Sequence, residues 1–153
     1  MLRTSINEAL KEAMKARDER RVATLRMMNA AIKNADIEAR GQGKPPLNEH
    51  DLLALFQKMI KQRQEAAELY EKGGRAELAA KEREEIEIIA SYLPKQMSDL
   101  EAGAAISAIL HEINAQSMKD MGRAMAALRE RFAGKMDFAK ASAKIKELLA
   151  GKG

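Results

Sequence analysis

The chain has 153 residues, enough for one moderately sized domain or two small ones, and such a domain can bury a core without covalent staples. It contains no cysteine, which excludes disulfide bonds and thiolate chemistry and fits a reducing compartment. The net charge of +4, from 27 basic and 23 acidic residues, is too mild for the dense basic patch of a dedicated DNA-binding protein.

Neither end of the sequence indicates a membrane or a targeting segment. No apolar run approaches the ~18 residues of a membrane-spanning helix. The N-terminus lacks a continuous apolar stretch, and Glu8, Glu12 and Asp18 argue against an acid-poor transit peptide. We therefore expect a soluble cytoplasmic protein with no membrane partner.

The charge is distributed unevenly along the chain. Residues 1–44 carry ten basic and six acidic residues, residues 45–94 carry seven and ten, and residues 95–153 carry ten and seven. Two basic regions therefore flank an acidic one. Aromatic residues make up only 3% of the chain and tryptophan is missing, so stacking of bases on aromatic rings is not the expected mode of recognition.

Helical periodicity continues along almost the whole chain, and the pattern predicts an all-α protein without strands. Four helices are expected in the first half. The second of them begins after Asp18 and ends at the glycines and prolines of residues 41–46. Asn48 is expected to cap a long third helix, which the Gly73-Gly74 turn reverses into a fourth, so that these two form an antiparallel hairpin.

Pro94 closes this half, because proline displaces the residue before it from the α region. Three helix-start signals follow it: the capping-box pairs Ser98 with Glu101 and Ser117 with Asp120, and the N-cap Asp137. We therefore expect two domains. Residues 1–94 are predicted to form a helical N-terminal domain of four helices, and residues 95–153 a compact three-helix domain.

Two charged residues interrupt the apolar stripes of the predicted hairpin. Arg63 lies on the buried face of the third helix and Glu82 on that of the fourth, at nearly the same level from the Gly73-Gly74 turn. We expect a partly buried ion pair between Arg63 and Glu82, with Glu85 as the alternative partner. The pattern favours a structural role for this pair over a catalytic one.

The sequence contains no recognisable set of catalytic or metal-binding residues. His50 and His111 are far apart, and phosphate-binding loops, nucleophile elbows and zinc-protease helices are missing. The glutamates of the acidic run 82–87 point in different directions from one helix, which is typical of a solvated face rather than a metal site. We predict no catalytic residue, no metal and no cofactor, and a chain that is not catalytic by itself.

The C-terminal third offers basic side chains for a nucleic-acid interface. Arg123 points away from the apolar stripe of its helix and Arg129 flanks it, while Lys140 and Lys144 share one exposed face at i, i+4 spacing. Such a surface fits either ordinary solvation or a patch that follows phosphates. Gly122, one residue inside its helix, would allow a phosphate or another backbone to come close.

Three methionines in the same region have two interpretations. Met118, Met121 and Met125 could form an adaptable groove for a protein partner. Their spacing equally matches the apolar stripe of a helix that fills a core. The sequence leaves both interpretations open.

Eight short elements stand in order along the chain: Leu25-Arg26-Met27, Ala31-Ile32-Lys33, Lys61-Gln62-Arg63, Gly74-Arg75, Glu82 with Glu85, Tyr92-Leu93-Pro94, Asp120-Met121-Gly122-Arg123 and Gly134-Lys135-Met136-Asp137. Together, across nearly all of the chain, they resemble the YqeY-like family of small bacterial proteins. The C-terminal part of that family is similar to the tail domain of GatB, the B subunit of the glutamine-dependent aspartyl/glutamyl-tRNA amidotransferase.

The resemblance implies an all-helical N-terminal domain followed by the three-helix GatB/YqeY domain. In the amidotransferase the tail helps to hold tRNA, while the chemistry resides in other domains and another subunit. Carried over, the resemblance implies RNA contacts by Arg123, Arg129 and Lys135, to which the exposed face of the last helix adds Lys140 and Lys144. A family-level description, carbon-nitrogen ligase with glutamine as amido-N-donor, comes with it, but this sequence lacks residues for that reaction.

Three hypotheses about function follow. The first is an accessory module that binds tRNA, or a protein of tRNA aminoacylation, in connection with transamidation. The second is a helical protein-protein interaction module with no role in RNA. The third is amidotransferase activity of the chain alone. No DNA partner is expected under any of them.

Overall fold

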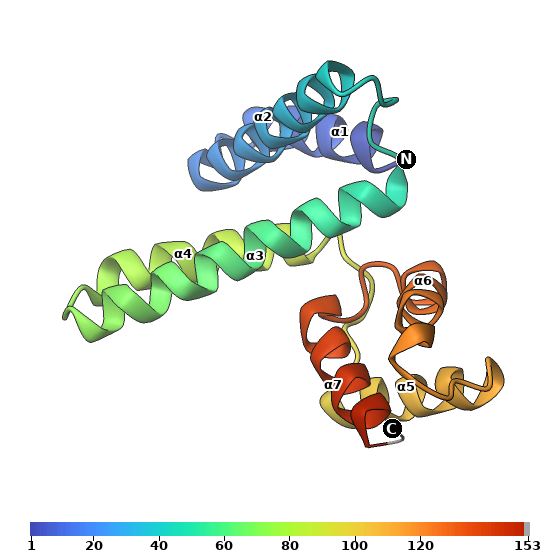
Figure 1. The fold of residues 1–153 in the computed structure, drawn as a ribbon. Helices are drawn as coiled ribbons and strands as arrows, with labels where there is room; N and C mark the ends of the chain where they lie inside the picture. The colour runs from blue at the N-terminus through green and yellow to red at the C-terminus, as the bar shows by residue number, and fades with distance from the viewer. Residues whose placement is uncertain (152–153) are drawn as a thin grey trace. The chain divides into compact units, whose positions relative to one another are not determined.

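The computed structural model describes residues 1–151, and their regular structure is helical throughout (Figure 1). The predicted all-α class is confirmed, since no strand occurs in this range. The helices are α1 (Leu2–Lys15), α2 (Glu19–Gly41), α3 (Glu49–Lys72), α4 (Ala76–Ala90), α5 (Asp99–Glu112), the 3-10 turn η1 (Met118–Asp120), α6 (Met121–Arg131) and α7 (Phe138–Ala150). They group into two compact units, Met1–Leu93 and a second unit that begins at Pro94.

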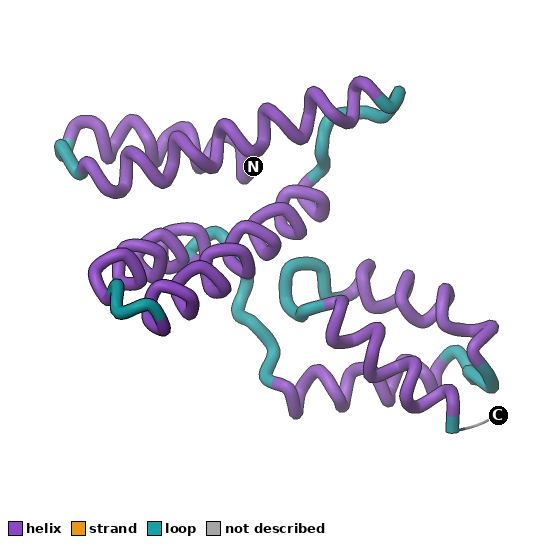
Figure 2. The backbone as a smooth tube through the Cα atoms, turned by 60° about the vertical axis from the view of Figure 1, so that its left-hand side comes forward, coloured by secondary structure: helices purple, strands orange, loops and turns teal. Residues whose placement is uncertain are grey.

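The first unit contains two helical hairpins, α1 with α2 and α3 with α4 (Figures 1 and 2). Gly74 makes the turn between α3 and α4 with a φ of +74°, a conformation that glycine adopts without steric cost. Both hairpins contribute to one apolar core, whose fully buried members include Ile6, Leu25, Met28, Leu52, Phe56 and Ile89. Burial of each such side chain contributes roughly 2 kcal/mol, so this core holds the four helices together.

The second unit packs α5, α6 and α7 around a core of its own. Ile106, Leu128 and Ile145, one from each helix, are at most 3% exposed. Met136, in the turn before α7, is also 3% exposed and belongs to the same core. This turn is therefore anchored by a buried side chain.

Side-chain caps begin most of the helices. Three predicted N-caps are confirmed, each accepting a hydrogen bond from a backbone N–H of the first turn: Asn48, Ser98 and Asp137. Asp18, after which the second helix was expected to begin, caps α2 in the same way. Ser98 also forms the predicted capping box with Glu101. The pair Ser117 and Asp120 forms a box as well, but it opens the short turn η1, and α6 starts behind that turn.

The structure pairs Arg63 with Glu85, the alternative partner, in place of the expected Glu82. Nε of Arg63 donates to Oε2 of Glu85 at 3.1 Å, and the two side chains are only 14% and 15% exposed. The rest of the guanidinium donates to the carbonyl oxygen of Met59 at 3.0 Å and to Sδ of Met27 at 2.7 Å. Arg63 thereby connects α2, α3 and α4.

The register of the hairpin explains the choice of partner. Counted from the Gly73-Gly74 turn, Glu85 lies one residue beyond the level of Arg63, whereas Glu82 lies two residues short of it. With the rise per residue of an α-helix, this difference of two residues places Glu82 about 3 Å nearer to the turn than Arg63. Glu85 therefore reaches the buried charge more directly.

A second ion pair, which the sequence analysis did not predict, joins α1 to α2. The two terminal nitrogens of Arg3 donate to the two carboxylate oxygens of Asp36 at 2.7 and 2.9 Å. The backbone N–H of Leu47 also donates to Asp36, and the carbonyl oxygen of Leu47 accepts from Arg3. The Arg3 guanidinium, followed by the Leu47 N–H, lowers the pKa of the Asp36 carboxyl. The loop between α2 and α3 is thus tied to the first hairpin.

Asp120 organises the turn that precedes α6. Its carboxylate accepts from the backbone N–H of Gln116 at 2.8 Å, from that of Ser117 at 3.3 Å and from the Arg123 guanidinium at 2.7 Å. The N–H of Gln116, then the guanidinium and the N–H of Ser117, lower the pKa of Asp120 from 3.8 to about 2. The ionised carboxylate is therefore part of the folded state.

We predict that Arg63→Ala lowers the free energy of unfolding by about 3 kcal/mol, because it strands the mostly buried carboxylate of Glu85. Glu85→Ala should cost a similar amount. Glu82→Ala is the matched control and should cost less than about 1 kcal/mol. Urea unfolding followed by circular dichroism measures all three, and a larger loss for Glu82→Ala than for Glu85→Ala would contradict the observed pairing.

We predict that Asp120→Asn destabilises the protein at neutral pH and that this effect disappears in acid. A lowered folded-state pKa contributes stability that is present above the ordinary pKa of 3.8 and is lost as the pH falls through about 2. The difference in Tm between wild type and variant should therefore be largest above pH 3.8 and shrink toward pH 2. A difference in Tm that does not change with pH would show that ionisation of Asp120 contributes nothing.

Candidate functional site

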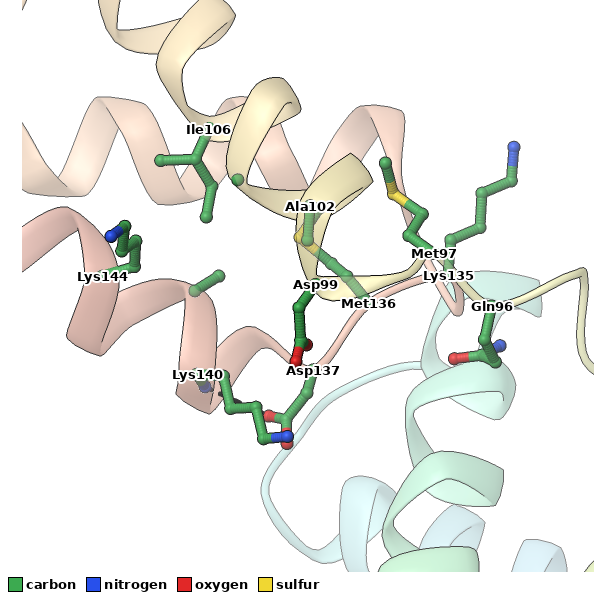
Figure 3. A pocket seen from close by; sticks show the side chains of 12 residues that line it. Gln96, Met97, Asp99, Ala102, Ile106, Lys135, Met136, Asp137, Lys140 and Lys144 are labelled. Carbon is green, nitrogen blue, oxygen red and sulfur yellow. Dashed lines mark hydrogen bonds between the residues drawn. The ribbon is translucent and has the colours of Figure 1, made fainter.

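A pocket of about 560 Å³ opens on the surface of the second unit. It lies between the first two turns of α5, the turn before α7 and the first two turns of α7 (Figure 3). Its walls are formed by Gln96, Met97, Asp99, Ala102, Gly103, Ile106, Lys135, Met136, Asp137, Lys140, Ala141 and Lys144. All of these residues belong to the second unit, so the pocket is a feature of that unit alone.

Two hydrogen bonds hold the edges of the pocket together. The side-chain amide of Gln96 donates to the carbonyl oxygen of Gly134 at 2.6 Å. The backbone N–H of Met97 donates to the carbonyl oxygen of Lys135 at 2.8 Å. Gly134 is buried and has a φ of +75°, which allows the chain to turn toward α7. The segment before α5 and the turn before α7 are thereby joined, and the pocket lies beside this junction.

Three of the five predicted RNA-binding residues line this one pocket: Lys135, Lys140 and Lys144. All three are exposed, and Figure 3 shows their side chains extending in different directions rather than converging on one point. Three separated ammonium groups suit a ligand with several negative charges, because each lysine can follow its own phosphate. They do not form a cage around one compact anion.

The other two predicted RNA-binding residues lie outside the pocket, on α6. Arg123 donates to Asp120 at 2.7 Å and to the carbonyl oxygen of Ile113 at 3.3 Å, so its guanidinium supports the start of its own helix. Arg129 is exposed on the same helix. The sequence predicted one basic surface, but the structure brings only the three lysines together.

The interior of the pocket is apolar, with carboxylates at its edge. Ile106, Met136 and Ala141 are each 3% exposed and form the inner wall. Asp99 and Asp137 line the same space (Figure 3). No serine, threonine, cysteine, histidine or tyrosine is among the lining residues. The lining thus combines an apolar inner wall with a few charged and polar groups, which is common in ligand-binding pockets.

Two glutamates of the acidic run 82–87 form ion pairs within the first unit. Glu84 pairs with Arg20 and Glu85 with Arg63. Within residues 1–151, no group of three histidine, aspartate or glutamate side chains is arranged to hold a metal ion. In the same range, no helix is both long and apolar enough to span a membrane.

The structure also separates the three methionines that the sequence left ambiguous. Met125 is buried in the core of the second unit, and Met121 packs partly buried against it. Only Met118 is substantially exposed, at 42%. The core interpretation therefore fits two of the three residues, and no groove of three methionines exists.

Gly103 and Asp99 are pocket residues that the sequence analysis missed. Gly103 lies inside α5, where glycine is less favourable than alanine by roughly 0.5 to 1 kcal/mol. A Cβ at this position would meet nothing within 4 Å, so no neighbouring helix requires the glycine. The sequence has a similar helical glycine at Gly122, which lies outside the pocket, so a glycine inside a helix was not enough to locate the pocket.

Comparisons with known proteins agree with the resemblance found in the sequence. A family model described as Yqey-like protein matches residues 3–149. The curated proteins named "Altered inheritance of mitochondria protein 41, mitochondrial" include relatives from Lachancea thermotolerans, 37% identical over 111 residues, and Eremothecium gossypii, 34% identical over 111 residues. Each of these two alignments covers 71% of this chain and 58% of the relative.

A Saccharomyces cerevisiae protein of the same name is 36% identical over 84 residues, which cover 55% of this chain and 44% of the relative. The chain therefore spans little more than half the length of the curated relatives it matches. These relatives are yeast proteins named as mitochondrial, and they give no support to the expected bacterial character. Because the family model covers nearly all of the sequence, the chain belongs to the YqeY-like family.

Proposed function

We propose that this protein is an accessory module that binds tRNA through the lysine-lined pocket of its second unit. In this proposal the second unit corresponds to the three-helix GatB/YqeY domain, and the module is related to glutamine-dependent tRNA transamidation. Its partner is tRNA itself, or tRNA together with a protein of aminoacylation. The cytoplasmic location remains a prediction, since the named relatives are mitochondrial.

The observation that carries the proposal is the position of Lys135, Lys140 and Lys144 around one pocket. Their ammonium groups are exposed, so phosphates can reach them without displacing a protein partner. Neutralising phosphates releases condensed counterions, which is the main source of affinity in sequence-independent RNA binding. Three such contacts on one small unit support a phosphate-binding surface despite the modest net charge.

The composition of the pocket supports an accessory role over a catalytic one. Transfer of an amide nitrogen requires activation of a carboxyl group and a source of ammonia, which in turn need a nucleophile or a phosphate-activating site. The lining residues offer lysines, carboxylates and one amide. We therefore infer that the family-level description, carbon-nitrogen ligase, refers to an enzyme complex of which such domains are a part.

A protein-protein interaction module is the second candidate, and one observation in the first unit favours it. Leu69 and Leu78 lie on either side of the Gly73-Gly74 turn and are 70% and 37% exposed. Apolar side chains at the tip of a long hairpin can contact a protein partner. Under this alternative, partner binding resists high salt and is insensitive to ribonuclease.

We predict that purified protein retains total tRNA on filters and that log K falls linearly with log salt concentration. The combined change Lys135→Ala, Lys140→Ala and Lys144→Ala should reduce the slope by about 2 to 3, because each lost phosphate contact removes roughly 0.7 to 0.9. Circular dichroism melts should show that the triple variant is folded. Absent binding, or a slope near zero for the wild type, would overturn the proposal.

A charge-matched variant supplies the control. The exposed surface of α2 in the first unit carries Arg26, Lys33 and Arg40. Changing all three to alanine removes the same three positive charges as the pocket variant, at positions distant from the pocket in the sequence. We expect this variant to keep the wild-type salt slope. Equal losses in the two triple variants would mean that binding reflects net charge rather than the pocket.

A further inference from the structure

We propose that the pocket receives one unpaired nucleobase that carries an exocyclic amino group, such as adenine or cytosine, in preference to uracil, while the surrounding lysines contact the neighbouring phosphates. This inference rests on the proposed function, because it names the part of the RNA that the same site recognises. It follows from the size of the pocket, its open backbone at Gly103 and its hydrogen-bond acceptors.

The size and walls of the pocket fit a base. A volume of about 560 Å³ lies in the range of small-molecule sites. The buried side chains of Ile106, Met136 and Ala141 give the inside an apolar surface. Since no aromatic residue lines the pocket, a bound base is held between aliphatic side chains and not stacked on a ring.

Gly103 leaves the wall of α5 open where a ring would enter. A Cβ built there meets nothing within 4 Å, and the residue lines the pocket. Gly122 on α6 is also free of neighbours within 4 Å, but it lies outside the pocket. Both glycines therefore lie in helices and lack close neighbours, and they differ in whether they line the pocket.

The hydrogen-bond acceptors at the edge of the pocket argue against a phosphate beside them and for a base. The carboxylate of Asp99 has no hydrogen-bond or ion-pair partner within residues 1–151, and it would repel a phosphate placed beside it. The amide nitrogen of Gln96 is already used to donate to Pro94 and Gly134, which leaves the side-chain oxygen as an acceptor. Both groups can accept from an amino group.

These acceptors determine which bases fit. Adenine, cytosine and guanine each present an amino donor on the pairing edge, whereas uracil has no amino group and presents a carbonyl oxygen on each side of its single N–H. A carboxylate accepts from the amino group and repels the carbonyl oxygen. The lysines, which extend in separate directions around the pocket (Figure 3), then contact phosphates on either side of the bound nucleotide.

The test compares labelled single-stranded oligoadenylate, oligocytidylate and oligouridylate of equal length by fluorescence anisotropy at fixed salt. We expect the wild type to bind the first two at least about fivefold more tightly than oligouridylate. Gly103→Leu should abolish this preference, because the leucine side chain fills the space of the base. The salt slope of tRNA binding should stay unchanged, since the lysines remain.

Two controls separate the base pocket from other effects. Leucine is a better helix former than glycine, so Gly103→Leu and the matched Gly122→Leu should both melt no lower than the wild type. Gly122→Leu should keep the base preference. Asp99→Asn should remove most of the preference while the pocket stays open, because an amide can face either an amino group or a carbonyl oxygen.

The outcomes distinguish the inference from the function on which it rests. Salt-dependent tRNA binding without a base preference, or a preference that survives in Gly103→Leu, would overturn the base pocket and leave the tRNA proposal standing. Failure to bind tRNA or any of the oligonucleotides would overturn both. Tighter binding of oligouridylate would show that the acceptors of the pocket do not select a base with an amino group, and would overturn the inference.

Discussion

The junction between the segment before α5 and the turn before α7 is the constraint on which the candidate site depends. Both segments end at N-caps, Ser98 and Asp137, which satisfy the first N–H groups of their helices and so determine where each helix begins. Gln96 bonds to Gly134, and Met97 to Lys135, between these two starts. The first turns of α5 and α7 consequently face a common space, and the pocket residues on both helices come from those turns.

The helix starts could be predicted because a cap is a local interaction between residues two or three apart, and the relevant side chains stand in the sequence. The partner of Arg63 was harder to predict, since Glu82 and Glu85 share one helix face and differ by less than one turn. The Arg3 and Asp36 pair escaped prediction because 33 residues separate its members. Three lysines of the pocket could be named from the sequence, but the pocket itself depends on three segments meeting, which no local pattern encodes.

Two of the three arginines in the second unit have surroundings that differ from those of the pocket lysines. Arg123 and Arg131 are engaged with Asp120 and Glu112, and Arg131 makes two hydrogen bonds to its carboxylate. The rigid fork of a guanidinium suits such fixed pairs, whereas a lysine ammonium is a mobile point charge. The lysines around the pocket are left to contact something other than the protein. This difference explains how a chain with a modest net charge can still have several exposed lysines around one pocket.

The family model matches residues of both units, so the proposed RNA binding by the second unit has to be considered together with the first unit. The first unit has a separate core and presents a long hairpin with exposed leucines on both sides of its turn. A chain that binds RNA with one unit and a protein with the other would bring the RNA to that protein. Protein binding by the first unit would then be compatible with RNA binding by the second, unlike the alternative in which the chain has no role in RNA.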